Sequence, residues 1–222
     1  MRLRAVALLV GLVGCRPIDE AERSPDPKDS PTAAAPRPAV PAAPVVSAAL
    51  PDFAAVVERI APSVVSVICT LPVAGGRPKR GIGSGTVVRA DGLVVTNAHV
   101  VPEVATAIDI QYADQERVRA RVVHREPLLD LAVLMPEPAR AEQAPVVFRE
   151  RPIRPGEWVV AVGHPFGLGD TVTVGVVSGL GRDYGDVGRP ATLPKDGYYA
   201  FVQTDASINT GSSGGPLVDL RG

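Results

Sequence analysis

Beyond residue 50 the chain consists of short apolar runs separated by turn-forming residues, with the two-residue period of β-strands. Only residues 53–60 show helical spacing, between Asp52, a potential N-cap, and Pro62, which would stop a helix. Many short strands with no long helix between them favour antiparallel barrels or a sandwich over an α/β sheet. We therefore predict an all-β domain over 51–222, with a tight turn at 90–92 and strands at 64–70, 83–89, 93–96, 108–112, 117–123, 131–134, 158–162, 171–178, 199–203 and 216–218.

The composition limits the classes of partner and of metal site. Lys and Arg nearly balance Asp and Glu, with a net charge of -1, which argues against a nucleic-acid-binding protein. The hydrophobic fraction is 45%, mostly aliphatic, and it is sufficient for a packed core. The two cysteines, Cys15 and Cys69, cannot form a disulfide scaffold or a cysteine-rich zinc site, so we expect no metal and no cofactor. Cys69 lies in a predicted strand and is expected to be a buried small hydrophobe.

The first 14 residues have the layout of an export signal. Arg2 and Arg4 precede a ten-residue apolar run, which is much shorter than the roughly 20 residues of a membrane span. The run ends in Leu-Val-Gly before Cys15 and resembles the lipobox of bacterial lipoproteins. The resemblance implies that Cys15 is lipidated and anchors the chain to a membrane of the bacterial cell envelope. The alternative is an ordinary cleaved signal followed by an incidental cysteine.

Residues 15–50 form a segment of different composition. Between residues 16 and 50 there are 8 prolines and 9 alanines, with no glycine and no aromatic residue. Such a segment cannot bury enough apolar surface to offset the entropy lost on ordering. Its proline content favours extended backbone, so we predict a disordered, semi-rigid tether between the anchor and the domain. A disordered leader without a tethering role would look nearly the same.

Three local patterns in the domain carry the residues of acyl-transfer chemistry. His99 lies in Thr-Asn-Ala-His-Val-Val at the end of a predicted strand, Asp130 opens an apolar strand, and Ser213 lies in Gly-Ser-Ser-Gly-Gly. A serine hydroxyl needs an imidazole base at neutral pH, and the imidazole needs an acceptor that fixes its tautomer. The three residues therefore supply nucleophile, base and orienting acid, in the chain order of the chymotrypsin arrangement.

The glycines around Ser213 have separate roles in this reading. Gly211 would allow its own N–H and that of Ser213 to converge on one point and form an oxyanion hole. Gly214 and Gly215 would keep bulk away from the nucleophile, so that a peptide carbonyl can approach.

The domain resembles a known family through five sequence blocks that occur in the same order. Residues 53–222 are similar to the protease domain of the HtrA/Deg (high-temperature-requirement) branch of trypsin-like serine proteases, and the blocks are GIGSGTVV at 81–88, TNAHVV at 96–101, LLDLAVL at 128–134, GEWVVAVGHPFGLGDTVTVGVVSGLGR at 156–182 and FVQTDASINTGSSGGPLVDL at 201–220.

The resemblance implies a chymotrypsin/trypsin-like double antiparallel β-barrel with the catalytic residues between the barrels. It implies an endopeptidase that acts on unfolded or misfolded envelope proteins, usually as a homotrimer, with PDZ modules downstream. By family matching, His99 is the general base, Asp130 its orienting acid and Ser213 the nucleophile, and the Gly211 and Ser213 amides are the oxyanion donors.

Each of these residues also has a structural interpretation without catalysis. An isolated histidine is usually a surface or satisfied core residue, and we interpret His124 and His164 in that way. Asp130 could simply open a strand, and a glycine-rich run such as the one around Ser213 could be a flexible turn. Ser212 stands where the family most often has asparagine.

The substrate pocket is predicted from the residues before the nucleophile. Ser207 lies six residues before Ser213, where trypsin carries the acid that selects Arg and Lys. With Ser207 and Ile208 near the pocket floor, we expect cleavage after small or medium apolar residues such as Val, Ala or Ile.

Only nine residues follow Ser213, where the family has further strands that close the second barrel. We therefore expect a truncated domain with an incomplete second barrel, open strand edges and uncovered apolar faces, and a sequence that is a fragment of a longer protein. Two alternatives to an envelope protease stay open: a non-catalytic envelope lipoprotein that holds peptides as a chaperone, and an inactive gene fragment.

Overall fold

The computed structural model describes residues 50–141, 143–164, 171–183 and 200–222. The predicted signal peptide, the lipidation site Cys15 and the tether up to residue 49 lie outside the described residues. Within the described ranges, no helix has both the length and the apolar character that crossing a membrane requires.

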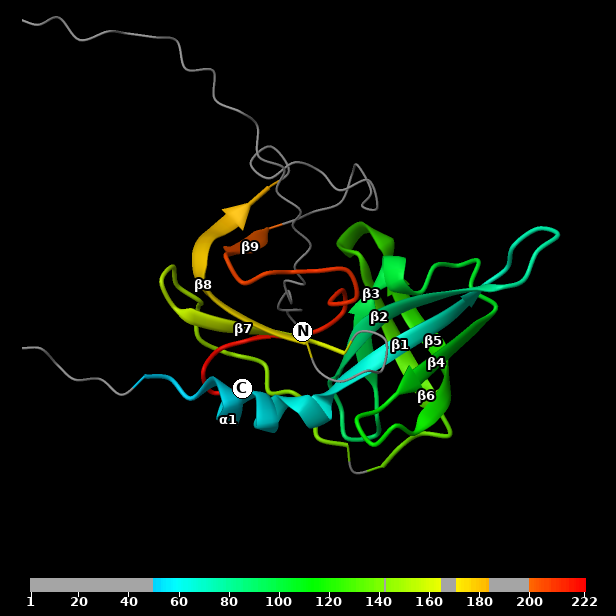
Figure 1. Cartoon of the computed structure of the whole chain (residues 1–222), viewed down its shortest axis with the longest axis horizontal. Helices are drawn as coiled ribbons and strands as arrows, with labels where there is room; N and C mark the ends of the chain where they lie inside the picture. Colours follow the sequence, from blue (N-terminus) through cyan, green and yellow to red (C-terminus); the bar gives the residue numbers. More distant parts are fainter. Residues whose placement is uncertain (1–49, 142, 165–170, 184–199) are drawn as a thin grey trace, which may run out of the picture. The chain divides into compact units, whose positions relative to one another are not determined.

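The first half of the domain is a closed antiparallel barrel (Figure 1), in which β1 pairs with both β2 and β4. Its strand order is β1-β2-β3-β6-β5-β4. A short 3₁₀ turn, η2 (Ala98–Val100), follows β3, and a second, η3 (Pro127–Leu129), precedes β6. The strands are β1 Val64–Leu71, β2 Lys79–Val87, β3 Val94–Asn97, β4 Ala107–Gln111, β5 Arg117–Glu126 and β6 Leu131–Glu137.

The barrel interior is aliphatic, as the composition predicts. Alternate residues of the strands point inward, and the buried cluster includes Val65, Val67, Val87, Val94, Ile110 and Leu134. Cys69 belongs to this cluster at 1% exposure, and its burial raises the pKa of its thiol. The expectation of a buried small hydrophobe at this position is confirmed.

The second half contains an open sheet of four strands among the described residues, in the order β10-β7-β8-β9. These are β7 Trp158–Gly163, β8 Thr171–Arg182, β9 Phe201–Thr204 and β10 Leu217–Val218. All pairs in both sheets are antiparallel. The all-β fold with a second, incomplete sheet is confirmed, and each predicted strand matches an observed strand, with shifts of a few residues at the ends.

The predicted helix is α1 (Phe53–Ile60), and the carboxylate of Asp52 caps it by accepting the N–H of Ala55 at 3.0 Å. The chain continues through Pro62 as a 3₁₀ turn, η1 (Ala61–Ser63), before β1. The apolar side of α1 packs against β7 and β10: Val56 and Ile60 cluster with Val64, Val160, Val162 and Val218. A helix that precedes the first barrel in sequence therefore covers the second sheet.

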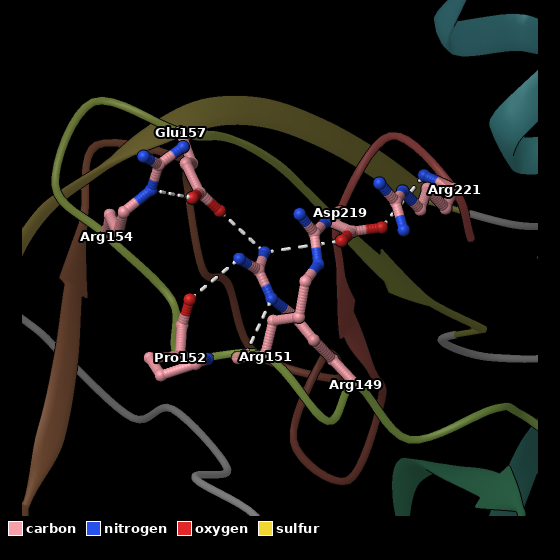
Figure 2. A network of polar contacts seen from close by, with 7 residues as sticks. All are labelled: Arg149, Arg151, Pro152, Arg154, Glu157, Asp219 and Arg221. Atoms are coloured by element: carbon pink, nitrogen blue, oxygen red, sulfur yellow. Dashed lines mark hydrogen bonds and ion pairs between the residues drawn. The ribbon is translucent and has the colours of Figure 1, made fainter.

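The segment between β6 and β7 is held to the second sheet by Arg149 (Figure 2). Its guanidinium lies 2.6 Å from Glu157 and 3.2 Å from Asp219, and it donates to the carbonyls of residues 151–152 at 3.0 and 2.9 Å. Glu157 also accepts from Arg154 at 2.7 Å. Hydrogen bonds from Arg149 first, and then from Arg154, lower the pKa of Glu157 to about 2.

Candidate active site

His99 and Asp130 lie in short turns beside two neighbouring strands of the first barrel. His99 is the middle residue of η2, directly after β3, and Asp130 ends η3, directly before β6. Because β3 pairs with β6 up to Asn97 opposite Leu131, the two turns lie at the same end of the barrel. Asp130 has a positive φ of 52°, a conformation that aspartate adopts more readily than most residues.

The carboxylate of Asp130 makes two hydrogen bonds to His99. Its Oδ2 lies 2.7 Å from the imidazole Nδ1, and its Oδ1 accepts the His99 backbone N–H at 2.9 Å. Because an ionised carboxylate only accepts, Nδ1 carries the proton in this pair, and Nε2 of the neutral ring keeps its lone pair. The Asp130 side chain is 7% exposed and that of His99 is 24% exposed, so the acid is buried while the ring reaches the surface.

Ser213 lies in a turn that two backbone hydrogen bonds define. The N–H of Ser212 donates to Asn209 at 3.0 Å, and that of Gly215 donates to Ser212 at 2.9 Å. Gly211 and Gly214, on either side of Ser213, have φ values of 97° and 92°. These left-handed conformations favour glycine, which agrees with the predicted role of Gly211 in turning the backbone.

Strand β2 brings the Ser213 turn next to the His99 turn. The N–H of Ser84 donates to the Ser213 carbonyl at 2.7 Å. A Cβ on the neighbouring Gly83 would lie 2.7 Å from Val100, the residue after His99, and 3.2 Å from the Ser213 carbonyl oxygen. The described contacts include no hydrogen bond between the side chains of His99 and Ser213 themselves.

The two predicted pocket residues have different surroundings. Ile208 lines a small pocket together with Ala161, Ser212 and Gly215, directly beside the Ser213 turn. Ser207 is exposed and does not line that pocket, and its carbonyl accepts the hydroxyl of Thr173 on β8 at 2.7 Å. Of the two, Ile208 is the one placed at the edge of a cavity near the nucleophile.

A larger cavity of about 580 Å³ lies elsewhere in the domain. Its walls are mainly apolar residues of β3, β7, β10 and the 146–153 segment, such as Val95 and Val159, together with Thr86 and Val88 at the end of β2. None of the predicted site residues lines it, so its size alone does not make it the reactive site.

We assign no catalytic role to the side chains of the other two histidines. His124 is exposed on β5, and His164 is buried at 3% exposure with its backbone N–H bound to the Ser84 hydroxyl at 2.9 Å. The described residues contain no group of three or more His, Cys, Asp or Glu side chains that could hold a metal ion.

Sequence reasoning missed the polar residues that hold the Ser213 turn. Ser84 and Thr86 of β2 and Thr96 of β3 are all buried and all hydrogen-bonded close to that turn. The available signal was a run of small and polar residues, Gly-Ser-Gly-Thr, within a predicted strand. The partners of Ser84 and Thr86 lie more than 120 residues away in sequence, which local spacing does not reveal.

Comparisons with known proteins agree with this geometry. A family model described as "Trypsin-like peptidase domain" matches residues 83–222. A probable periplasmic serine endoprotease, DegP-like, from Ectopseudomonas mendocina is 34% identical over 217 residues, covering 80% of this chain and 43% of the relative. The periplasmic serine endoprotease DegP of Escherichia coli is 41% identical over 151 residues, covering 67% of this chain and 30% of the relative.

A solved structure also resembles the chain. The HtrA-type protease AlgW with tripeptide aligns with a TM-score of 0.64 and 36% identity, covering 77% of this chain and 51% of that structure. The chain spans less than half the length of these two curated relatives. The matched family model covers more than half of the chain, and the chain therefore belongs to the trypsin-like peptidase family, as a serine protease domain of the HtrA/DegP type.

Proposed function

We propose that His99, Asp130 and Ser213 form a catalytic triad that hydrolyses peptide bonds. The observation that carries this proposal is the pair of hydrogen bonds from His99 to Asp130, since it fixes the ring and leaves Nε2 as the base. A histidine with an incidental surface role would not need a buried carboxylate on both its ring and its backbone.

The proposed reaction follows from these protonation states. The Ser213 hydroxyl oxygen attacks the carbonyl carbon of the scissile bond while its proton moves to Nε2 of His99. The imidazolium, stabilised by Asp130, then gives that proton to the leaving amine, and an acyl-enzyme forms. Water attacks the acyl-enzyme by the same route and releases the carboxylic acid. The hydrogen bond between imidazole and hydroxyl in such sites often forms only with the substrate in place.

The amides of Gly211 and Ser213 are the proposed donors to the oxyanion. The positive φ of Gly211 and the fixed turn around Ser213 support this assignment. One such donor typically contributes about 2.7 to 4 kcal/mol of transition-state stabilisation. Ile208 and, next to it, Ser207 are the proposed determinants of the residue accepted before the scissile bond.

The proposed substrates are unfolded or misfolded proteins of the bacterial cell envelope. The names of the DegP and DegP-like relatives place those proteins in the periplasm, and the sequence before residue 51 suits export and tethering. We further propose a lipid anchor at Cys15 and a homotrimer as the assembly. Metabolic labelling of the whole chain with a radioactive fatty acid, lost in a Cys15→Ser variant, tests the anchor.

A fluorophosphonate probe, which reacts only with an activated serine, tests the triad on the whole chain. The expected result is labelling of Ser213, located by peptide mass spectrometry, that disappears in Ser213→Ala and His99→Ala. Ser178→Ala, which removes an exposed serine of β8, is the matched control and should be labelled like the wild type. Labelling that is absent in the wild type, or equal in wild type and Ser213→Ala, would contradict the protease assignment and favour a peptide-holding or inactive chain.

A further inference from the structure

Three carbonyl groups of the Ser213 turn are held by two residues of the other half of the domain. The hydroxyl of Ser84 donates to the Gly211 carbonyl at 2.6 Å, and its backbone N–H donates to the Ser213 carbonyl at 2.7 Å. The hydroxyl of Thr86, two residues along β2, donates to the Gly214 carbonyl at 3.1 Å. The turn that carries the nucleophile thus belongs to the second half in sequence but is bonded to β2 of the first barrel.

Ser84 is fully buried and its hydrogen-bonding groups are all used. Its hydroxyl also accepts the backbone N–H of His164, the residue after β7, at 2.9 Å, and its carbonyl accepts the hydroxyl of Thr96 at 2.7 Å. A side chain with no exposed surface whose hydroxyl oxygen both donates and accepts has a fixed orientation. Ser84 therefore presents a rigid donor to Gly211.

The hydrogen bond to the Gly211 carbonyl matters because glycine, which has no Cβ, restricts its own backbone dihedral angles very little. A peptide unit is planar, so holding the Gly211 carbonyl fixes the plane of the next peptide, whose N–H belongs to Ser212. Holding the Ser213 carbonyl in the same way leaves the backbone between the two bonds little freedom to rotate. The segment that carries the proposed nucleophile and the Ser213 N–H, one of the two proposed oxyanion donors, is thereby clamped at its two ends, and the Gly211 N–H lies directly before it.

The packing beneath the turn leaves no space for a side chain at Gly214. A Cβ at Gly214 would lie 1.9 Å from the Ser84 carbonyl oxygen and 2.3 Å from the Thr96 hydroxyl. The backbone of the turn is therefore in direct contact with the backbone of β2. The hydroxyl of Ser84 adds a directional hydrogen bond to this contact.

We propose that the buried hydroxyl of Ser84 is a positioning residue for the reaction: it sets the Gly211 to Ser213 backbone in the orientation that stabilises the oxyanion. Ser84 touches neither the substrate nor the reacting atoms, and it acts through the Gly211 carbonyl. Without its hydroxyl, that carbonyl would lose its partner in a buried position and would turn toward other donors. The inference deepens the proposed function and rests on it for its kinetic part.

The test compares Ser84→Ala with Ser63→Ala in the whole chain. Ser63 is a matched control because it is 2% exposed and its hydroxyl also donates one short hydrogen bond, to the Ala144 carbonyl at 2.7 Å, away from the Ser213 turn. The first readout is kcat and KM on a chromogenic peptide, and the second is the rate of labelling by a fluorophosphonate. The third is amide hydrogen exchange of residues 209–215, which needs no activity.

We expect Ser84→Ala to lower kcat and the labelling rate by about 10- to 100-fold, with KM changed less than about threefold, because the lost contact acts on the transition state. The Ser212 and Gly215 amides, which close the turn, should exchange at least about tenfold faster. Thr86→Val, which keeps the side-chain shape but removes the bond to Gly214, should give a smaller loss of the same kind. Ser63→Ala should change none of the three readouts by more than about twofold.

Equal kcat in Ser84→Ala and Ser63→Ala, with unchanged exchange in the turn, would overturn the inference. If the wild type were not labelled, the proposed triad would be wrong, but the exchange readout would still decide whether Ser84 orders the turn. If Ser84→Ala were to unfold, Thr86→Val would have to show the faster exchange of residues 209–215, and its failure to do so would equally overturn the inference.

Discussion

Asp130 accepts hydrogen bonds from both the imidazole Nδ1 and the backbone N–H of His99, at 2.7 and 2.9 Å. The two bonds fix the ring and the turn that carries it relative to one buried carboxylate. In the proposed mechanism, the charge on Asp130 serves the imidazole in two ways: it selects the tautomer and it stabilises the imidazolium formed during the reaction.

Asp130→Asn should lower kcat by about 10⁴-fold while the fold is retained. The amide has nearly the same shape, but it can donate to Nδ1 and so favour the tautomer in which Nε2 carries the proton. Peptide hydrolysis and the fluorophosphonate labelling rate measure the loss, and circular dichroism checks the fold. A variant that keeps more than about a tenth of the wild-type activity would show that Asp130 only shapes the turn.

Gly214→Ala should be far more destabilising than Gly156→Ala. Both residues have similar positive φ values, 92° and 86°, so both substitutions cost about 1–2 kcal/mol for the left-handed conformation. At Gly156 a Cβ would meet nothing within 4 Å, whereas at Gly214 it would meet the Ser84 carbonyl oxygen at 1.9 Å. We expect at least about 2 kcal/mol of additional loss at Gly214, measured by urea unfolding, together with loss of labelling. Equal losses in the free energy of unfolding for the two variants would mean that the structure around Gly214 adjusts to the added methyl group at no energetic cost.

The ion pairs of Glu157 should make the stability of the domain depend on pH below about 5. The pKa of Glu157 falls from an ordinary 4.5 to about 2 in the folded state, so its contribution is present above pH 4.5 and is lost as the pH falls toward 2. Glu157→Gln should lower Tm at pH 7, and the difference from the wild type should shrink between pH 4.5 and 2.

Glu58→Gln, on the exposed side of α1, is the control for this series, with a small effect at every pH. Thermal scans at intervals of half a pH unit would provide the measurement. A Glu157→Gln difference that stayed constant from pH 7 to 2 would contradict the assignment of that pH dependence to Glu157.

The substrate preference can be tested with a panel of peptides that differ only in the residue before the scissile bond. Ile208 lines the small pocket beside the Ser213 turn, and no acid lines that pocket among the described residues, so Val, Ala or Ile should give the highest kcat/KM. A panel in which Arg or Lys was best would overturn the predicted pocket. Ile208→Ala should shift the preference toward larger apolar residues if this side chain limits the depth of the pocket.

Local sequence patterns were enough to predict the elements of the fold. The helical spacing after Asp52 and the two-residue period of the apolar runs gave α1 and the strands, because burial on one face produces a period that is visible in a few residues. The ends were less accurate: β2 begins at Lys79 rather than at residue 83, because its first residues are exposed and lack the apolar signal.

The site residues could be predicted from the sequence only where they lie in a short, distinctive motif. His99, Asp130 and Ser213 each lie in a distinctive local pattern, and the pairing of the first two follows from β3 and β6 being neighbours. Of Ile208 and Ser207, Ile208 lines the small pocket, while the Ser207 carbonyl accepts the hydroxyl of Thr173, 34 residues away, and the local sequence does not reveal this difference. The role of the Ser84 hydroxyl could not be predicted from the local sequence for the same reason, because its hydrogen-bond partner lies 127 residues away and is close to it only in the folded chain.

The bonds from β2 to the Ser213 turn also affect how the domain tolerates thermal motion. Because the turn is fastened to the barrel that carries His99, a small rocking of the second sheet would strain the chain on either side of the turn, between Ile208 and β10, before it separated the side chains of the proposed base and nucleophile. The alignment of base and nucleophile would then be an internal property of one barrel, and the second sheet could vary its geometry to suit different substrates without losing that alignment.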